Sequence, residues 1–274
     1  MSTQIDTGTN DLLATLDEGV LTLTLNRPEA RNAMTGDMTS ALAAQLADAE
    51  LNPEVKVIVL TGAGKGFCAG GDVKGMAAKG DGTVGDNTID GAIHRQRVNQ
   101  RNTAGKLYSM PKPTVAVLPG AAAGAGLSLA LACDLRIMSS NAIMTTAFAR
   151  VGFSGDYGGS WLLTQLIGPS RTKDLYYTAR RVQADEALQL GLFNHVVADA
   201  ELPSAAFELA KQIASGPPIA LGYMKENINR AVTGDLRSCL ALEADRMTRC
   251  AATKDHKEAV TAFLEKRQPV FSGR

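Results

Sequence analysis

The pattern of apolar and polar positions predicts short strands and helices that alternate over most of the chain. Strand-like apolar runs occur at Leu12–Leu16, Val20–Leu25, Val57–Leu60, Val115–Leu118, Leu135–Met138, Ile143–Thr146 and Asn194–Val197. The first two runs flank Asp17-Glu18-Gly19, which predicts a hairpin. Helical periodicity predicts helices at Met38–Glu50, Ala92–Tyr108, Gly124–Cys133, Gly158–Leu166, Ser170–Thr178 and Ala184–Leu190. Lys79–Gly91, rich in glycine and aspartate, is predicted to be a mobile loop.

The pattern changes near residue 200, where strands give way to amphipathic helices. These are predicted at Pro203–Ser215, Pro218–Ala231, Leu236–Cys250 and Thr253–Lys266. We therefore predict an α/β core over residues 1–200 and an all-helical region over residues 201–274.

The composition is that of a soluble globular protein. The 274 residues are 45% apolar and 20% charged, which permits one large core, with or without a subdomain. A net charge of zero argues against nucleic acid or a membrane surface as the main partner. Pro113–Cys133 is uncharged and long enough to imitate a transmembrane helix. Pro119 and several glycines interrupt it, so a strand, a turn and a buried helix are expected instead.

The cysteines and histidines do not form a recognisable metal or disulfide pattern. No CxxC spacing joins the four cysteines, Cys68, Cys133, Cys239 and Cys250, so reduced thiols are expected. No paired-ligand spacing joins the three histidines, His94, His195 and His256, so no metal site is expected. The N-terminal MSTQIDTGTND carries acids but no base, unlike a secretory or organellar leader, and a cytoplasmic location is expected.

Two glycine-rich turns each follow a predicted buried strand. One lies within Leu60–Asp72 and the other within Val115–Gly126. Glycine permits positive φ and lets other atoms approach the main chain closely. A turn that opens a helix also presents unpaired N–H groups. Two such turns can direct two N–H donors at one oxygen, so the pattern predicts an oxyanion hole that stabilises an enolate.

Several linked motifs resemble the crotonase (enoyl-CoA hydratase/isomerase) superfamily, and the resemblance covers nearly the whole chain. The motifs are NRPEARNAM at Asn26–Met34, GFCAGGD at Gly66–Asp72, GAAAGAG at Gly120–Gly126 and AFLEKRQPVF at Ala262–Phe271. The resemblance implies a spiral of ββα units and C-terminal helices that build a homotrimer, or a hexamer made from two trimers. It also implies an acyl-CoA thioester substrate, with coenzyme A as part of the substrate and no separate cofactor.

The resemblance assigns roles to individual residues. The N–H groups of Gly71 and Ala125 fall at the two oxyanion donors. Contacts with coenzyme A are implied for Arg31, Ala69, Lys74, Phe263 and Lys266. Of these, Lys74 matches a contact with the nucleotide end, and the last two match a neighbouring subunit's tail.

The residues around the expected acyl group favour isomerisation over hydration. The two glutamates of the hydratase branch correspond here to Ser128 and Phe148, neither of which is a carboxylate. Asp156, in GFSGDYGG, resembles the single acid/base of dienoyl-CoA isomerases and ring-1,2-epoxyphenylacetyl-CoA isomerases. Apolar neighbours would raise its pKa toward neutrality, which suits a proton shuttle. We expect isomerisation of an enoyl-, dienoyl- or ring-epoxide acyl-CoA, with hydration through Asp156 alone as the alternative.

Other interpretations remain open at this point. Asp156 could be an N-cap for a helix from Gly158 onward, and the glycines could be ordinary tight turns. Gly62-Ala63-Gly64 suggests a dinucleotide fingerprint, but Phe67 leaves GxGxxG incomplete. A thioesterase, or a non-catalytic protein that binds CoA esters, would use the same turns.

Four further positions have both a structural and a functional interpretation. Ser128 lacks the GxSxG context of a hydrolase nucleophile, so we expect a core hydroxyl bonded to a backbone carbonyl. His94 is expected on the surface. Tyr157 and Trp161 are expected in the core, and would suit a bulky or cyclic acyl group if they line the pocket.

Overall fold

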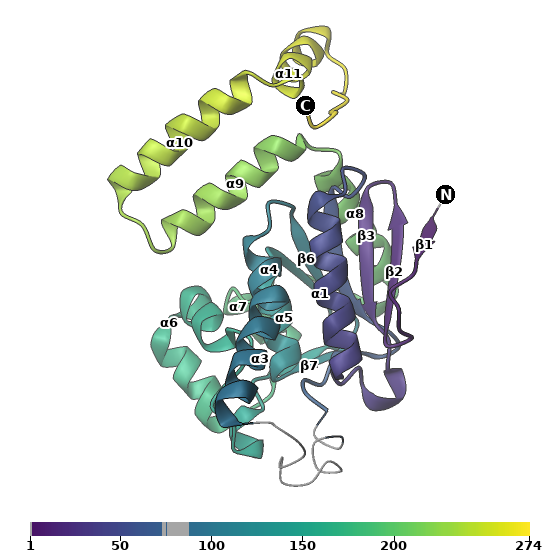
Figure 1. The fold of residues 1–274 in the computed structure, drawn as a ribbon, viewed down its shortest axis with the longest axis vertical. Helices are drawn as coiled ribbons and strands as arrows, with labels where there is room; N and C mark the ends of the chain where they lie inside the picture. Colours follow the sequence, from purple (N-terminus) through teal and green to yellow (C-terminus); the bar gives the residue numbers. More distant parts are fainter. Residues whose placement is uncertain (1, 73–74, 76–87) are drawn as a thin grey trace.

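The computed structural model describes residues 2–72, 75 and 88–274, and its core is built on a seven-stranded mixed sheet (Figure 1). In spatial order the strands are β1 (Thr3–Ile5), β2 (Leu12–Asp17), β3 (Val20–Leu25), β4 (Val57–Gly62), β6 (Thr114–Leu118), β8 (Leu135–Ser139) and β11 (His195–Val197). The pairs among β1, β2 and β3 are antiparallel, and the pairs from β3 to β11 are parallel.

A smaller sheet of four short strands carries the two glycine-rich turns. Its order is β10 (Val182–Gln183), β9 (Ile143–Thr145), β7 (Ala121–Ala123) and β5 (Gly66–Cys68). Strand β5 belongs to the first turn and β7 to the second, and the two pair in parallel. This pairing brings together segments about fifty residues apart in the sequence.

The central strands of the large sheet are buried on both faces, as continuous apolar runs predict. In β4, Ile58 and Leu60 pack in the main core, whereas Val57 and Val59 pack in a second cluster with α8 (Leu202–Ala214). This alternation follows from the two-residue period of a strand.

The remaining helices of the core surround the two sheets. They are α1 (Gly36–Leu51), α3 (Ile89–Asn102), α4 (Ala104–Ser109), α5 (Ala125–Ala132), α6 (Gly159–Thr178) and α7 (Ala184–Gln189), and short 3₁₀ segments occur at Pro28–Ala30, Phe148–Val151 and Asp199–Glu201. Helix α5 is buried along its whole length. Helix α6 is kinked at Gly168, just before Pro169, which agrees with the two shorter helices predicted there.

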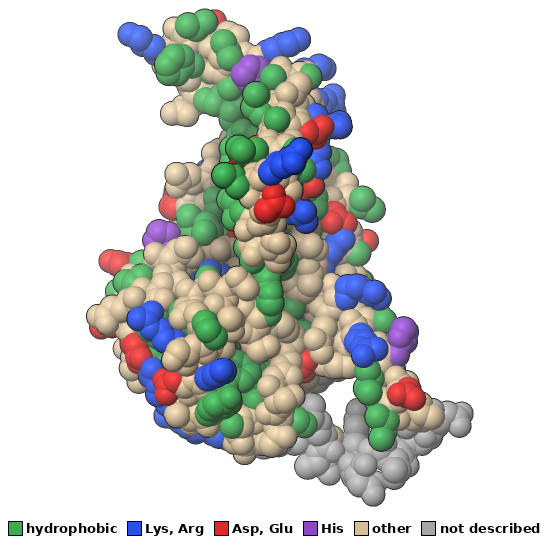
Figure 2. Space-filling view, turned by 90° about the vertical axis from the view of Figure 1, so that its left-hand side faces the viewer, with side chains coloured by type: hydrophobic (Ala, Val, Ile, Leu, Met, Phe, Trp, Pro, Cys, Tyr) green, Lys and Arg blue, Asp and Glu red, His purple; other side chains and the backbone are tan. Residues whose placement is uncertain are grey.

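Three C-terminal helices project from the core (Figure 1): α9 (Pro218–Ala231), α10 (Leu236–Ala251) and α11 (Lys254–Glu265). Helix α9 is attached through the buried Lys225. The Nζ of this lysine lies 2.9 Å from Asp134 Oδ2 and donates to the Leu107 carbonyl at 2.8 Å. The exposed apolar side chains of these helices are prominent in Figure 2.

The expected α/β class with a helical C-terminal region is confirmed, and Pro113–Cys133 indeed forms strands and a buried helix. Two predictions need correction. The helix predicted at Ala92–Tyr108 is divided at Thr103. Of the loop predicted at Lys79–Gly91, residues 79–87 lie outside the described residues, and the helix already begins at Ile89. None of the helices in the described part of the chain has the length and apolar character needed to span a bilayer.

Candidate active site

The two glycine-rich turns touch each other through their backbones. Gly70 has a φ of 92°, and a Cβ built there would lie 2.9 Å from the Ala123 carbonyl oxygen and 3.4 Å from the Ala125 nitrogen. A Cβ on Gly126 would lie 2.6 Å from the Cβ of Cys68. The glycines therefore permit a close approach that a side chain would prevent. The interpretation of these residues as ordinary tight turns is insufficient.

The N–H groups of Gly71 and Ala125 are unpaired within the described structure. The neighbouring bonds bypass Gly71, because Met34 N–H donates to the Gly70 carbonyl and Asp72 N–H donates to the Met34 carbonyl. Ala125 is the first residue of α5, where a helix has no internal acceptor for its N–H. Both residues line the same cavity.

The buried Asn32 holds the first turn in place. Its Nδ2 donates to the carbonyls of Ala63 and Gly66, both at 2.9 Å. Its Oδ1 accepts from the Arg27 N–H at 2.9 Å. The motif NRPEARNAM thus supplies a side chain that braces the turn carrying Gly71.

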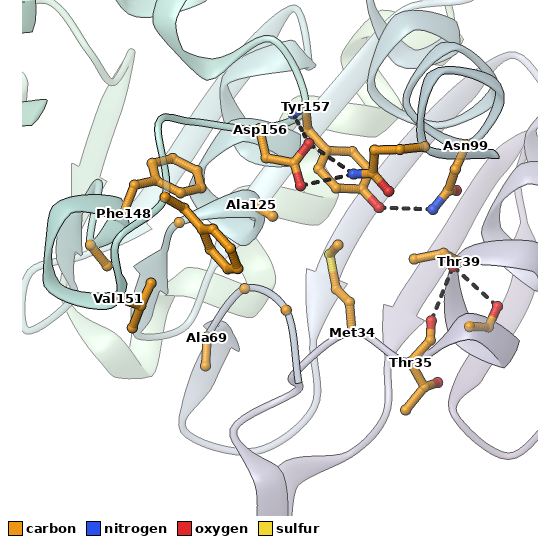
Figure 3. A pocket seen from close by; sticks show the side chains of 17 residues that line it. Met34, Thr35, Thr39, Ala69, Asn99, Ala125, Phe148, Val151, Asp156 and Tyr157 are labelled. Atoms are coloured by element: carbon orange, nitrogen blue, oxygen red, sulfur yellow. Dashed lines mark hydrogen bonds between the residues drawn. The ribbon is translucent and has the colours of Figure 1, made fainter. Parts of the chain in front are cut away.

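The cavity has a volume of about 270 Å³ and is bounded by both turns, the start of α1, helix α3 and the segment before α6 (Figure 3). The described lining residues include Met34, Thr39, Phe148, Val151 and Tyr157. Asp156 carries the only charged side chain among them. The described lining therefore combines two backbone amides without a described partner, one carboxylate and largely apolar side chains.

Asp156 is half-buried and held by three hydrogen bonds. Gln96 Nε2, from α3, donates to Oδ1 and to Oδ2, each at 2.9 Å, and the Tyr157 N–H donates to Oδ1 at 2.8 Å. Burial raises the pKa of Asp156 above its ordinary value, and these hydrogen bonds oppose the rise. The direction of this shift agrees with the sequence-based expectation.

The helix-cap interpretation of Asp156 is wrong. The N-cap of α6 is Gly158, and no side chain caps this helix. The Asp156 side chain lies instead on the cavity wall. The carboxylate is therefore available for chemistry.

The two positions that correspond to the hydratase glutamates have no acid function. The Ser128 hydroxyl is buried and donates to the Gly124 carbonyl at 3.3 Å, which confirms a core hydroxyl. The Phe148 ring stacks on Tyr176 with centroids 5.8 Å apart and lines the cavity. The turn at Gly62-Ala63-Gly64 leads into the short strand β5 rather than a helix, so the dinucleotide interpretation is also wrong.

Of the two aromatic residues that follow Asp156, Tyr157 lines the cavity and Trp161 does not. Tyr157 is buried, lines the cavity and accepts a hydrogen bond from Asn99 Nδ2 at 2.9 Å (Figure 3). Burial and the nearby Asp156 raise the pKa of its hydroxyl. Trp161 lies outside this cavity, edge-on to Tyr108, and is 38% exposed, so the expectation that it lies in the core is wrong. His94 is exposed, as expected.

The residues expected to contact coenzyme A are spread widely. Ala69 lines the cavity, and its N–H donates to the carbonyl of the exposed Arg31 at 3.0 Å. Lys74 lies outside the described residues. Phe263, on α11, and Lys266, at its end, are exposed and do not line the cavity of their own chain. Within the described part of the chain, Phe263 and Lys266 therefore do not join Ala69 at the cavity.

Sequence reasoning missed Gln96 and Asn99, which contact Asp156 and Tyr157. They are spaced by three residues on one face of α3, but nothing in the sequence connects that face with residues sixty positions later. Within the described residues, no cluster of three or more histidine, cysteine or acidic side chains could hold a metal ion.

Comparison with known proteins identifies the family. The profile of the enoyl-CoA hydratase/isomerase family matches residues 15–274. The 1,2-epoxyphenylacetyl-CoA isomerase of Escherichia coli is 36% identical over 263 residues, covering 96% of this chain and 98% of that protein. The short-chain-enoyl-CoA hydratase of Clostridium acetobutylicum is also 36% identical over 263 residues, covering 94% and 96%.

Solved structures support the same relationship. The crystal structure of an enoyl-CoA hydratase from Polaromonas sp. JS666 matches with a TM-score of 0.88 and 35% identity, covering 95% of this chain and 99% of that one. The expected crotonase-type fold is thereby confirmed. The chain belongs to the enoyl-CoA hydratase/isomerase family.

Proposed function

We propose that this enzyme isomerises an enoyl-, dienoyl- or ring-epoxide acyl-CoA. The N–H groups of Gly71 and Ala125 bind the thioester oxygen, and Asp156 carries the proton. The observation that carries the proposal is that Asp156 is the only charged side chain among the described residues of the cavity. Hydration in the two-glutamate manner would need a second carboxylate, and Ser128 and Phe148 cannot supply one.

The mechanism follows from the two donors and the carboxylate. Hydrogen bonds to the thioester oxygen stabilise the enolate that forms when carbon two loses a proton. Removing one such donor typically costs about 3–4 kcal/mol of transition-state stabilisation. Asp156 takes the proton from carbon two and returns it to carbon four, so the double bond moves into conjugation with the carbonyl. The proton ends on the product, and Asp156 is again ionised.

Hydration is the second candidate, because relatives of similar identity include proteins named hydratases. In that reaction Asp156 would activate a water without a carboxylate partner. We rank it second because Asp156 is the only carboxylate among the described lining residues, and it would have to hold and activate the water alone, whereas isomerisation needs no water.

The test compares Asp156→Asn with the wild type on trans-3-hexenoyl-CoA and trans-2-hexenoyl-CoA. We expect the wild type to conjugate the first substrate and the variant to be slower by about 10²–10⁴-fold. Asp185→Asn, at an exposed position on α7, is the matched control and should keep full activity. Undiminished isomerisation by Asp156→Asn would refute the role of Asp156, and brisk hydration of the second substrate would favour the hydratase.

We further propose that the chain forms a homotrimer, or a hexamer made from two trimers, and acts in the cytoplasm. Support comes from the exposed apolar side chains of α10 and α11, which include Leu236, Met247 and Phe263. In such an assembly Phe263 and Lys266 would reach the coenzyme A bound to a neighbouring subunit. Arg31, Ala69 and Lys74 would contact coenzyme A on the subunit that holds the acyl group, and no separate cofactor would be required.

A further inference from the structure

The amide of Gln96 makes an unusual contact with the cavity carboxylate. One nitrogen, Nε2, lies 2.9 Å from both oxygens of Asp156. A donor within hydrogen-bond distance of both oxygens restrains the carboxylate more than a donor to one oxygen alone. Because the Tyr157 N–H also donates to Oδ1, rotation of the carboxyl group about its bond to Cβ would break a hydrogen bond.

We infer that Gln96 is a positioning residue, which orients Asp156 for proton transfer by donating from one amide nitrogen to both carboxylate oxygens. The inference rests on the proposed role of Asp156 as the acid/base. It extends that role to helix α3, from which no catalytic contribution was expected.

The chemistry of an amide suits a group that must bind and release a proton. A lysine or arginine at this position would strongly favour the ionised carboxylate and weaken it as a base. An amide stabilises the carboxylate more weakly, and its oxygen can accept a hydrogen bond when Asp156 is protonated. Gln96 can therefore serve both states of a shuttle, whereas a cation would serve only one.

Among the described side chains, Gln96 is the main polar partner of the Asp156 carboxylate. No ion pair joins Asp156 to a charged residue in the described part of the chain. The described titratable groups that interact with it electrostatically are the hydroxyls of Tyr157 and Tyr176, on the adjacent segment and on α6. Both have raised pKa values and remain neutral where Asp156 titrates.

A second hydrogen bond holds α3 in the position from which Gln96 reaches Asp156. Asn99, one turn after Gln96, donates to the Tyr157 hydroxyl at 2.9 Å. Tyr157 has a left-handed φ of 52°, which is costly for a residue with a side chain. Two consecutive residues, 156 and 157, are thus each bonded to α3, although α3 contributes no buried residue of its own.

The first experiment measures kcat/KM against pH for Gln96→Met and Gln96→Glu with trans-3-hexenoyl-CoA. We expect Gln96→Met to move the acidic limb upward by roughly one unit and to lower kcat by roughly 10- to 100-fold, with KM nearly unchanged. Gln96→Glu should move the limb further, because a second carboxylate opposes ionisation of the first. The matched control is Gln100→Met, on the same helix, whose side chain makes no hydrogen bond in the described structure. Gln100→Met should change neither the acidic limb nor kcat.

A second experiment needs no substrate. In protein labelled with carbon-13 at aspartate carboxyl groups, the NMR signal lost in Asp156→Asn identifies Asp156, and its titration gives the pKa directly. We expect this pKa to rise in Gln96→Met and to stay unchanged in Gln100→Met.

The outcomes separate this inference from the proposed function. If Asp156→Asn is inactive while Gln96→Met keeps the wild-type pH profile and NMR titration, Gln96 has no positioning role. Lower thermal stability with unchanged titration would also overturn the inference, since it indicates a purely structural contact. If Asp156→Asn is fully active, the proposed function itself fails, whatever Gln96 does to the titration.

Discussion

At the residue scale, the described lining of the cavity contains one carboxylate, which is half-buried and forms no ion pair with a described residue. Burial raises the pKa of Asp156, and hydrogen bonds from Gln96 and the Tyr157 N–H limit that rise. The result is a stronger base than a solvated aspartate.

This environment predicts the pH dependence of the reaction. Asp156 must be ionised to take a proton, so kcat/KM should fall as pH decreases through its raised pKa. The acidic limb should therefore lie above about 4, the ordinary value for aspartate. A profile that remains flat down to about pH 4, at which the fold is still intact by circular dichroism, would contradict the assignment.

The closeness of the two turns gives a second prediction at this scale. A methyl group at position 126 would overlap Cys68, at 2.6 Å from both its Cβ and its carbonyl oxygen. We expect Gly126→Ala to lower the free energy of unfolding by about 1–3 kcal/mol and to reduce kcat by displacing Ala125. Urea titration and steady-state kinetics would measure the two effects.

The control is Gly105→Ala, on α4, where the new Cβ would meet its nearest atom at an ordinary 3.4 Å. It should leave activity unchanged. Wild-type stability and kinetics in Gly126→Ala would show that the two turns do not need this close approach.

At the scale of elements, a motif before α1 supports the turn that carries Gly71. Asn32 is fully buried, and it bonds two carbonyls of the turn and the Arg27 N–H. Buried polar groups that lose their partners pay a desolvation penalty. The turn is therefore held in shape by a side chain that is distant in sequence.

Replacing that side chain should loosen the turn. We expect Asn32→Ala to lower the free energy of unfolding by roughly 2–4 kcal/mol and to reduce activity, as measured by urea unfolding and by conjugation of trans-3-hexenoyl-CoA. Asn102→Ala, at an exposed position on α3, is the matched control. Equal stability of the two variants would contradict the bracing role of Asn32.

Elements with a strong local signal were predictable from the sequence, and those fixed by distant pairing were not. The buried run of β4 and the amphipathic α9 were found because apolar periodicity is local. Strands β5 and β7, three residues each of mainly small residues, form because they pair with each other, and β1 forms by pairing with β2.

The same distinction holds for the cavity. The resemblance directed attention to Gly71, Ala125 and Asp156, and the structure brings them to one cavity. Gln96 and Asn99 could not be predicted, because their role depends on how α3 lies against the segment before α6. The proposed contacts of Phe263 and Lys266 lie on another subunit, so the structure of one chain does not test them.

At the scale of the whole molecule, the C-terminal helices are incompletely covered. Helix α10 contributes no buried residue, and it exposes Leu236, Leu240 and Met247 at spacings of four and seven residues. An apolar stripe of this kind on a helix is typical of a packing surface. It agrees with the proposed trimer or hexamer.

Disrupting this stripe should dissociate the assembly. We expect the wild type to sediment as a trimer or hexamer, and Leu240→Asp with Met247→Asp to sediment as a smaller species with lower activity, because Phe263 and Lys266 would no longer reach a neighbouring cavity. Thr248→Asp, on the same helix, is the control. A wild type that is monomeric and fully active at every concentration tested would refute the assembly.

The most direct test of the central claim follows two isotopes in one reaction. Trans-3-hexenoyl-CoA carrying deuterium at carbon two is incubated with the wild-type enzyme in oxygen-18 water, and the products are analysed by mass spectrometry. One carboxylate that removes and returns the same hydrogen predicts a conjugated product with part of the deuterium at carbon four and no oxygen-18. A main product that carries oxygen-18 as a 3-hydroxyacyl-CoA would contradict the account.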